Sequence, residues 1–114
     1  MPDDRPPAVW WQVDLGERQR IGFVQVWPQT DGCCRDRLHN FHVFVSDHEL
    51  TADDPRVLLA QDEVSSYFVL GRAGAPTTID VRRPGRYVRI QMAYAGQMDL
   101  AEVQVWTDPS VAAR

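Results

Sequence analysis

Short runs in which apolar and polar residues alternate recur along the sequence, and turn-forming residues separate them. In Arg86–Met92, the apolar residues Val88, Ile90 and Met92 occupy every second position, which places them on one face of a β-strand. Helical periodicity is hard to find, and proline or glycine ends most of the runs. The predicted strands are Trp10–Leu15, Arg20–Trp27, Phe41–Ser46, Val57–Ala60, Tyr67–Leu70, Thr77–Val81, Arg86–Met92 and Leu100–Trp106.

Seven or eight short strands at this spacing predict an all-β fold, an antiparallel sandwich or barrel. Two runs, Val57–Ala60 and Tyr67–Leu70, have weaker patterns and are also open to interpretation as loop. A chain of 114 residues can bury one core but is too short for two domains. We expect one domain over residues 10–107, a linker or trimmed start over residues 1–9, and a tail over residues 108–114.

Charge narrows the range of partners. The formal net charge is −4, which argues against nucleic acid or an anionic membrane as the main partner. All 12 basic residues are arginine, whose planar guanidinium presents paired hydrogen-bond donors. No apolar segment approaches the length of a membrane span, and the polar, proline-rich start has no signal-peptide pattern.

Two adjacent cysteines, Cys33 and Cys34, lie between the predicted strands Arg20–Trp27 and Phe41–Ser46. Consecutive Cα atoms are about 3.8 Å apart, shorter than the roughly 4.4–6.8 Å of an ordinary disulfide. A bridge between them would close a small strained ring and form a rigid apolar knob on a polar loop. The residues alone favour two reduced cysteines, because a disulfide needs an oxidising compartment.

The same connection holds the densest set of polar groups in the chain. Connections at the end of a sandwich are where binding groups usually collect. The polar residues of the connection are Asp31, Arg35, Asp36, Arg37 and His39.

No nucleophile–base arrangement and no phosphate-binding glycine loop is present in the sequence, so it predicts a protein that is not an enzyme.

The histidines and tryptophans offer weaker candidates for a site. His39, His42 and His48 fit no common zinc spacing, and a structural or surface role is the preferred interpretation. Trp10 and Trp11 are neighbours on one predicted strand, so they face opposite ways. We expect one of them in the core and the other on the surface, where it could stack on a sugar.

Five segments carry a recognisable pattern: residues 10–16, 30–38, 40–47, 85–90 and 100–105. In this order, they resemble galactose-binding-like jelly-roll domains. This group includes the discoidin (coagulation factor five/eight C-type) domains, the family 32 carbohydrate-binding modules and the F-type fucose lectins. The cysteine pair followed by Asp36-Arg37 is similar to the F-type lectins in particular. The resemblance implies a one-domain jelly-roll sandwich with no catalytic role that binds fucose- or galactose-type glycans.

The resemblance also implies a sugar site. F-type lectins bind fucose through a histidine and two arginines, with a vicinal disulfide packed against an apolar edge of the sugar. Arg37 falls on the second arginine, and Gln29 replaces the first. By this resemblance Cys33 and Cys34 form the bridge, and Asp36 orients Arg37.

Besides Gln29, the chain departs from the family pattern at three further points. Gly32 is an extra residue before the cysteines, and Asp4 lies near the register of the family's histidine. Only nine residues precede Trp10, whereas the family has further strands and a calcium-binding loop there. The resemblance implies two calcium ligands in this chain, the Glu102 side chain and the Ala101 carbonyl. In the family, the loop that is missing here supplies most of the six to eight oxygens that calcium needs.

Two alternatives remain open. The first is a protein-interaction or structural module that has lost the sugar site, which the replacement at Gln29 and the missing histidine favour. The second is an accessory domain of a larger secreted glycoside hydrolase. The short start also predicts a sheet edge that is exposed or covered by a partner chain or parent domain. Localisation follows the cysteines: an oxidised Cys33–Cys34 pair implies a secreted or cell-surface protein.

Overall fold

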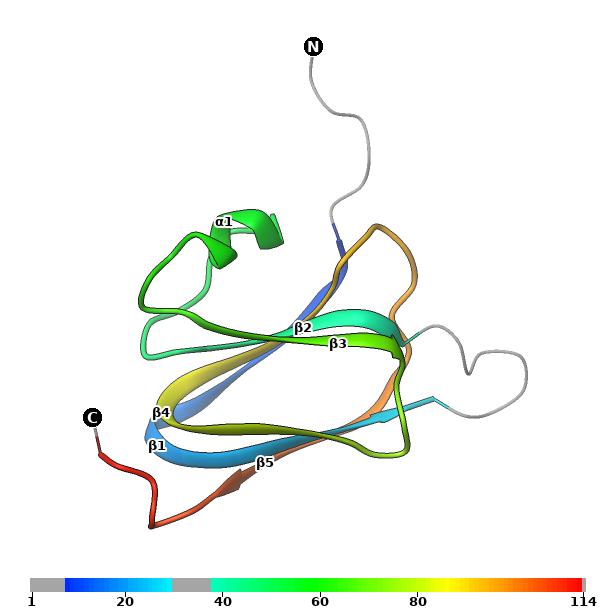
Figure 1. The fold of residues 1–114 in the computed structure, drawn as a ribbon. Helices are drawn as coiled ribbons and strands as arrows, with labels where there is room; N and C mark the ends of the chain where they lie inside the picture. The colour runs from blue at the N-terminus through cyan, green and yellow to red at the C-terminus, as the bar shows by residue number, and fades with distance from the viewer. Residues whose placement is uncertain (1–7, 30–37, 114) are drawn as a thin grey trace.

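The computed structural model describes residues 8–29 and 38–113, and within these ranges the chain forms five β-strands and one short helix (Figure 1). The strands form a single antiparallel sheet in the order β3-β2-β4-β1-β5. The all-β prediction is confirmed. The elements are β1 (Trp10–Pro28), β2 (His39–Ser46), α1 (Pro55–Leu59), β3 (Ser65–Arg72), β4 (Thr77–Met92) and β5 (Leu100–Thr107).

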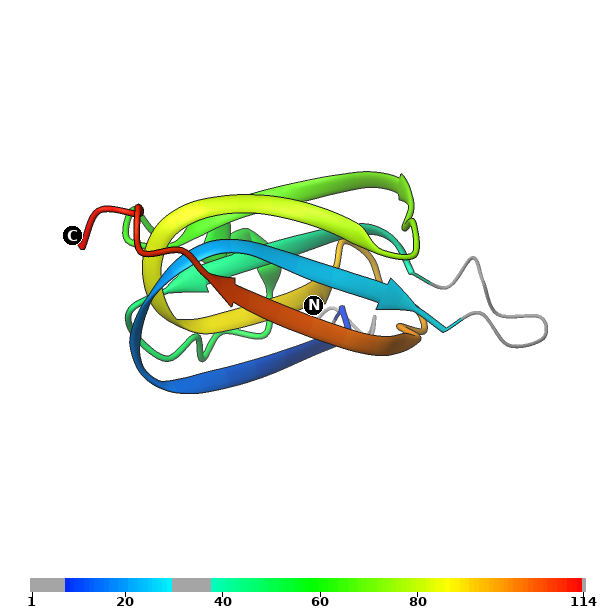
Figure 2. The same ribbon diagram turned by 90° about the horizontal axis from the view of Figure 1, so that it is seen from below.

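The two longest strands, β1 and β4, bend and so take part in two layers of the fold (Figure 2). In the first layer, residues 10–14 of β1 pair with residues 87–91 of β4, and β2 and β3 extend the sheet. In the second layer, the later half of β1 pairs with the earlier half of β4 on one side and with β5 on the other. The sheet therefore folds over on itself into a jelly-roll sandwich.

The bends explain why the sequence pattern predicts separate strands where the structure has continuous ones. Gly16 has a φ of 88° and Arg82 a φ of 53°, and the β1–β4 register shifts next to both residues. Gly16 therefore turns the strand instead of ending it. At the β4 bend the backbone of Gly85 packs against β2 so closely that a Cβ atom would lie 2.5 Å from Cγ1 of Val45. Only glycine fits this approach.

The core lies between the two layers. Inward positions alternate with outward ones along each strand, so that Val24 and Val26 of the second layer face Val43 and Ile90 of the first. All four side chains are fully buried. Burial of each such side chain contributes about 1.5–3 kcal/mol, so this regular alternation is the main source of stability.

The predicted strand Val57–Ala60 is wrong, because this segment is helical. Asp54 caps α1: its Oδ1 accepts a hydrogen bond from the Arg56 backbone N–H at 2.9 Å, and Pro55 occupies the first turn. Leu58 is buried in a small second cluster with Phe44, on the outer side of the first layer. The Asp-Pro pair was the sequence signal for a helix start.

Residues on both sides of the strand region are packed against it. Ala8 and Val111 are buried, and the carbonyl of Val9 accepts a hydrogen bond from the Met92 N–H at 3.0 Å. The strand region itself runs from Trp10, where β1 begins, to Thr107, where β5 ends, and the predicted limits of the domain stay a prediction. Within the described ranges, no helix has the length and apolar character needed to cross a membrane.

Candidate functional site

Three connections meet at one end of the sandwich, which we call the loop end. The last residue of β1, Pro28, pairs with Leu100 at the start of β5, and His39 at the start of β2 pairs with Arg72 at the end of β3. Figure 1 shows these strand ends on the same side of the molecule. The connections at the loop end are residues 29–38, 73–76 and 93–99.

The β1–β2 connection is anchored at both of its ends. The backbone N–H of Gln29 donates to the carbonyl of Asp99 in the β4–β5 connection at 3.0 Å. At the other end, the carbonyl of Leu38 accepts from the N–H of Ala73 in the β3–β4 connection at 2.9 Å, and the Leu38 side chain is fully buried. The base of the predicted sugar-binding segment is therefore fixed to its two neighbours.

Asn40, near the start of β2, links this strand to the end of β3 and to the β4–β5 connection. Its φ of 49° is a left-handed conformation that asparagine tolerates better than most residues. Its side-chain Oδ1 accepts from the Gly71 N–H at 2.7 Å, and its carbonyl accepts from the Ala93 N–H at 2.9 Å. Sequence reasoning missed this residue, although an asparagine at the start of a predicted strand is a typical signal for such a turn.

Two large apolar side chains project from the loop end. Leu70, near the end of β3, is 82 % exposed, and Tyr94, in the β4–β5 connection, is 71 % exposed. Met98, in contrast, packs against the core. An exposed aromatic ring beside polar loops is a surface on which the C–H face of a sugar can rest.

Most of the predicted sugar-binding residues lie outside the described part of the chain. Cys33, Cys34, Asp36 and Arg37 are in this group, so the predicted bridge and the role of Arg37 stay predictions. Gln29 is described, and it lies at the anchored base of the connection, half-buried.

The two residues predicted to bind calcium lie on β5. Glu102 and Ala101 are both exposed, and a carboxylate oxygen of Glu102 accepts a hydrogen bond from the amide of Gln104. Within residues 8–29 and 38–113, no group of three or more His, Cys, Asp or Glu side chains is placed to hold a metal ion. One carboxylate and one carbonyl are too few for calcium, so the described residues by themselves do not fit the ion.

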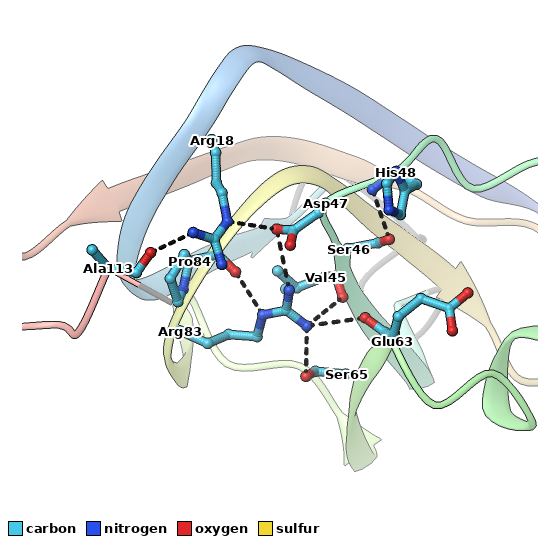
Figure 3. Close-up of polar contacts among 10 residues, drawn as sticks. All are labelled: Arg18, Val45, Ser46, Asp47, His48, Glu63, Ser65, Arg83, Pro84 and Ala113. Carbon is cyan, nitrogen blue, oxygen red and sulfur yellow. Dashed lines mark hydrogen bonds and ion pairs between the residues drawn. The ribbon is translucent and has the colours of Figure 1, made fainter.

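The opposite end of the sandwich carries a second polar cluster, centred on Arg83 (Figure 3). The Arg83 guanidinium donates to the carbonyls of Val45 at 3.3 Å and Glu63 at 3.2 Å, and to the hydroxyl of Ser65 at 3.0 Å. It also reaches the carboxylate of Asp47 at 3.4 Å. Arg83 therefore ties the β4 bend to the end of β2 and the start of β3.

Arg18 completes this cluster from β1. Its Nε donates to the same Asp47 oxygen at 3.1 Å, and its Nη1 donates to the carbonyl of Ala113 (Figure 3). The two guanidinium groups are engaged with acceptors of the protein itself. The cluster is thus a structural clamp at the bends and not a site with donors directed at a ligand.

A third arginine, Arg89, is fully buried beneath the segment that precedes α1. Its guanidinium donates to the carbonyls of Leu50 and Ala52, both at 2.6 Å, and to the side chain of Gln12 at 2.7 Å. The ring of Trp10 lies 3.9 Å from its central carbon. Burial lowers the pKa of Arg89, and the charge of Asp53 opposes that shift. Nothing in the sequence pattern distinguishes this arginine from those on the surface.

This contact also settles the role of the tryptophan pair. Trp10 lies on Arg89 and donates a hydrogen bond to Asp53 at 3.2 Å, while Trp11 points toward the inner side at the edge of the first layer. The exposed fractions are 38 % for Trp10 and 37 % for Trp11, so the expected division into one core and one surface residue does not hold.

The histidines behave as structural or surface residues. His42 packs between Phe44 and Phe68, with ring centroids 5.2 and 5.0 Å away, and burial lowers its pKa. The His48 backbone N–H donates to Ser46 at the end of β2.

Comparison with known proteins identifies the same fold and a related family. A model of the F5/F8 type C domain, described as a NedA-like, galactose-binding domain, matches residues 4–90. No curated protein sequence matches the chain.

Solved structures of similar proteins are sugar-binding modules. A fucose-binding module of Streptococcus pneumoniae superposes with a TM-score of 0.68 at 28 % identity, covering 87 % of this chain and 63 % of that one. The lectin domain of Lectinolysin complexed with Lewis B antigen gives a TM-score of 0.72 at 27 % identity, covering 90 % of this chain and 67 % of that one. The chain therefore spans about two thirds of the length of these neighbours.

Proposed function

Because the chain belongs to the F5/F8 type C family of NedA-like, galactose-binding domains, we propose that it binds carbohydrate and catalyses no reaction. Its ligands are fucose- or galactose-type glycans, and its site is the connection between β1 and β2. The observation that carries this proposal is the similarity to a fucose-binding module and to a lectin domain in complex with Lewis B antigen.

The arrangement of the loop end supports this location. The proposed binding segment starts at Gln29 and returns at Leu38, and both residues are hydrogen-bonded to neighbouring connections. A segment held at its base loses less conformational freedom when a ligand binds, which favours affinity. Tyr94 supplies an exposed aromatic surface at the same end of the sandwich.

The proposed contacts follow from the chemistry of a sugar. The guanidinium fork of Arg37 donates two parallel hydrogen bonds to neighbouring hydroxyls, and Asp36 holds that fork in place. The amide of Gln29 donates a further, uncharged hydrogen bond. A bridge between Cys33 and Cys34 presents its apolar surface to the C–H edge of the ring. Such a bridge requires an oxidising compartment, so secretion or display at the cell surface is part of the proposal.

Calcium is a secondary element of the proposal. Glu102 and Ala101 would be its ligands on β5, and further oxygens would have to come from outside the described residues.

Titration of non-reduced protein with Lewis b oligosaccharide tests the proposal. We expect Arg37→Ala to weaken binding more than tenfold, because a charge-assisted hydrogen bond contributes about 1.5–3 kcal/mol. Arg37→Lys should recover only part of the affinity, since an ammonium cannot form the fork. Arg56→Ala is the matched control, because its side chain is 79 % exposed on α1.

Unchanged binding in Arg37→Ala would remove the proposed site from this connection. Failure of folded wild-type protein to bind this glycan or any other with terminal fucose or galactose would favour the protein-interaction alternative. The replacement at Gln29 and the missing histidine are the features of this chain that support that alternative.

A further inference from the structure

The outer surface of the second layer combines aromatic and amide side chains. Along β1 and β5 the inward residues, such as Val24 and Val103, belong to the core, so the residues between them point away from it. These outward residues form a surface over three strands that we call the outer face. It includes Phe23, Gln25, Trp27, Thr78, Gln104 and Trp106.

A hydrogen-bonded row crosses this face from strand to strand. The indole N–H of Trp106 on β5 donates to Oε1 of Gln25 on β1 at 3.1 Å. The Gln25 amide in turn donates to the hydroxyl of Thr78 on β4 at 3.2 Å. The Gln25 amide keeps one N–H and one oxygen lone pair beyond these bonds, and their directions are fixed before any ligand arrives. The row therefore offers oriented donors and acceptors on a flat surface.

The aromatic part of the face is also held in place. The rings of Phe23 and Trp106 stack with centroids 5.9 Å apart and an interplanar angle of 18°. Trp106 is nevertheless 46 % exposed. Part of the indole therefore remains open to solvent although Phe23 stacks on it. A rigid, open indole can stack on the C–H face of a sugar ring at little entropic cost.

Charge restricts what this face can bind. The carboxylates of Asp80 and Glu102 are exposed on it, and Arg82 at its far margin lies 4.0 Å from Asp108. The described part of the face is thus acidic, which disfavours nucleic acid and sulfated polymers. The hydroxyl groups of a neutral sugar, in contrast, can form hydrogen bonds with carboxylates and with amides.

We propose that the outer face is a second binding site, which holds the interior of a neutral polysaccharide chain. Phe23 and Trp27 are four residues apart, or about 13 Å along the strand, so the face is longer than a single sugar ring. The site goes beyond the proposed function, because it uses none of the residues of the β1–β2 connection and does not need a terminal fucose or galactose.

Affinity electrophoresis tests this proposal with three soluble polymers in the gel: mixed-linkage β-glucan, xylan and glucomannan. These probes lack fucose and galactose ends, so the result is separate from that of the loop site. We expect at least one of them to retard the wild-type protein. Trp106→Ala should weaken that binding about tenfold, which is the loss expected for one aromatic stacking contact. Heparin should cause no retardation.

Phe68→Ala is the matched control, because Phe68 is a 50 % exposed aromatic residue of β3 in the other layer. It should bind like the wild type, and so should Arg37→Ala. If circular dichroism shows that Trp106→Ala does not fold, Gln104→Ala replaces it in the test. We expect Gln104→Ala to weaken polymer binding several-fold. The proposal is overturned if no neutral polymer retards the wild type, if both outer-face variants bind normally, or if Phe68→Ala loses as much as Trp106→Ala. Retardation by heparin alone would also overturn it.

Discussion

At the scale of single residues, arginine side chains form many of the hydrogen bonds that join distant segments of the described structure. Arg83 and Arg89 each donate to several carbonyl groups from different segments, and Arg86 forms a two-pronged pair with Asp14 at 2.7 and 3.0 Å. A planar group with five donors can join more segments than an ammonium can. Because all the basic residues of the sequence are arginine and none is lysine, each of them can join several segments in this way.

The Asp14–Arg86 pair predicts an acid-dependent component of stability. The hydrogen bond from Arg86, followed by the Gly16 backbone N–H, lowers the pKa of Asp14 to about 2. In the unfolded chain this pKa is about 3.9, so the pair stabilises the fold fully above that pH and its contribution disappears as the pH falls toward 2. The difference in melting temperature between the wild type and Arg86→Gln should thus be largest near neutral pH and shrink toward pH 2.

An NMR titration of the Asp14 side chain provides the direct control, since its pKa should rise in Arg86→Gln. A melting-temperature difference that stays constant between neutral pH and pH 2 would contradict the assignment.

At the scale of elements, the segment from β2 to β3 is the part that sequence patterns described least well. Its short apolar run predicts a strand, but the Asp54 cap and Pro55 begin a helix instead. The segment lies over the first layer because Leu58 packs on Phe44 and because Arg89 donates to two of its carbonyls. Periodicity could not reveal these contacts, since they depend on which strand face the segment covers.

Arg89→Met measures how much this buried arginine contributes. The substitution keeps much of the side-chain volume but leaves the carbonyls of Leu50 and Ala52 without their donor. We expect the free energy of unfolding to fall by about 3 kcal/mol, because each buried unsatisfied polar group costs roughly 1–3 kcal/mol. Urea denaturation provides the measurement.

Arg56→Met is the control for that experiment, because Arg56 is on the surface of α1 and its substitution should change stability by no more than about 0.5 kcal/mol. Equal stability of the two variants would show that Arg89 is not the link between this segment and the sheet.

At the scale of the whole molecule, the sequence predicted the class of fold, which the structure confirms, whereas the sugar site in the connection between β1 and β2 stays a prediction. Alternation identified the buried faces, as at Val88 and Ile90, and the resemblance to jelly-roll domains is confirmed by the family match. Alternation could not reveal that β1 and β4 run through both layers, because Gly16 and Pro84-Gly85 are as typical of chain reversals as of bends.

The candidate site was only partly predictable for a related reason. Motif residues such as Arg37 could be chosen by resemblance, whereas the residues that hold the loop end together act through backbone bonds between segments distant in sequence. Asn40, for example, contacts Gly71 and Ala93. The outer face could not be predicted from the sequence, because Phe23 and Trp106 become neighbours only through the pairing of β1 with β5.

The central claim is that this domain is a sugar-binding module, and a glycan-array screen of non-reduced protein tests it most directly. We predict binding to fucose- or galactose-terminated glycans, with loss after mild reduction, because the proposed Cys33–Cys34 bridge is part of the site. Loss in the presence of a chelator would extend the claim to calcium at Glu102. If protein that is folded by circular dichroism binds no such glycan, the sugar-binding account is wrong.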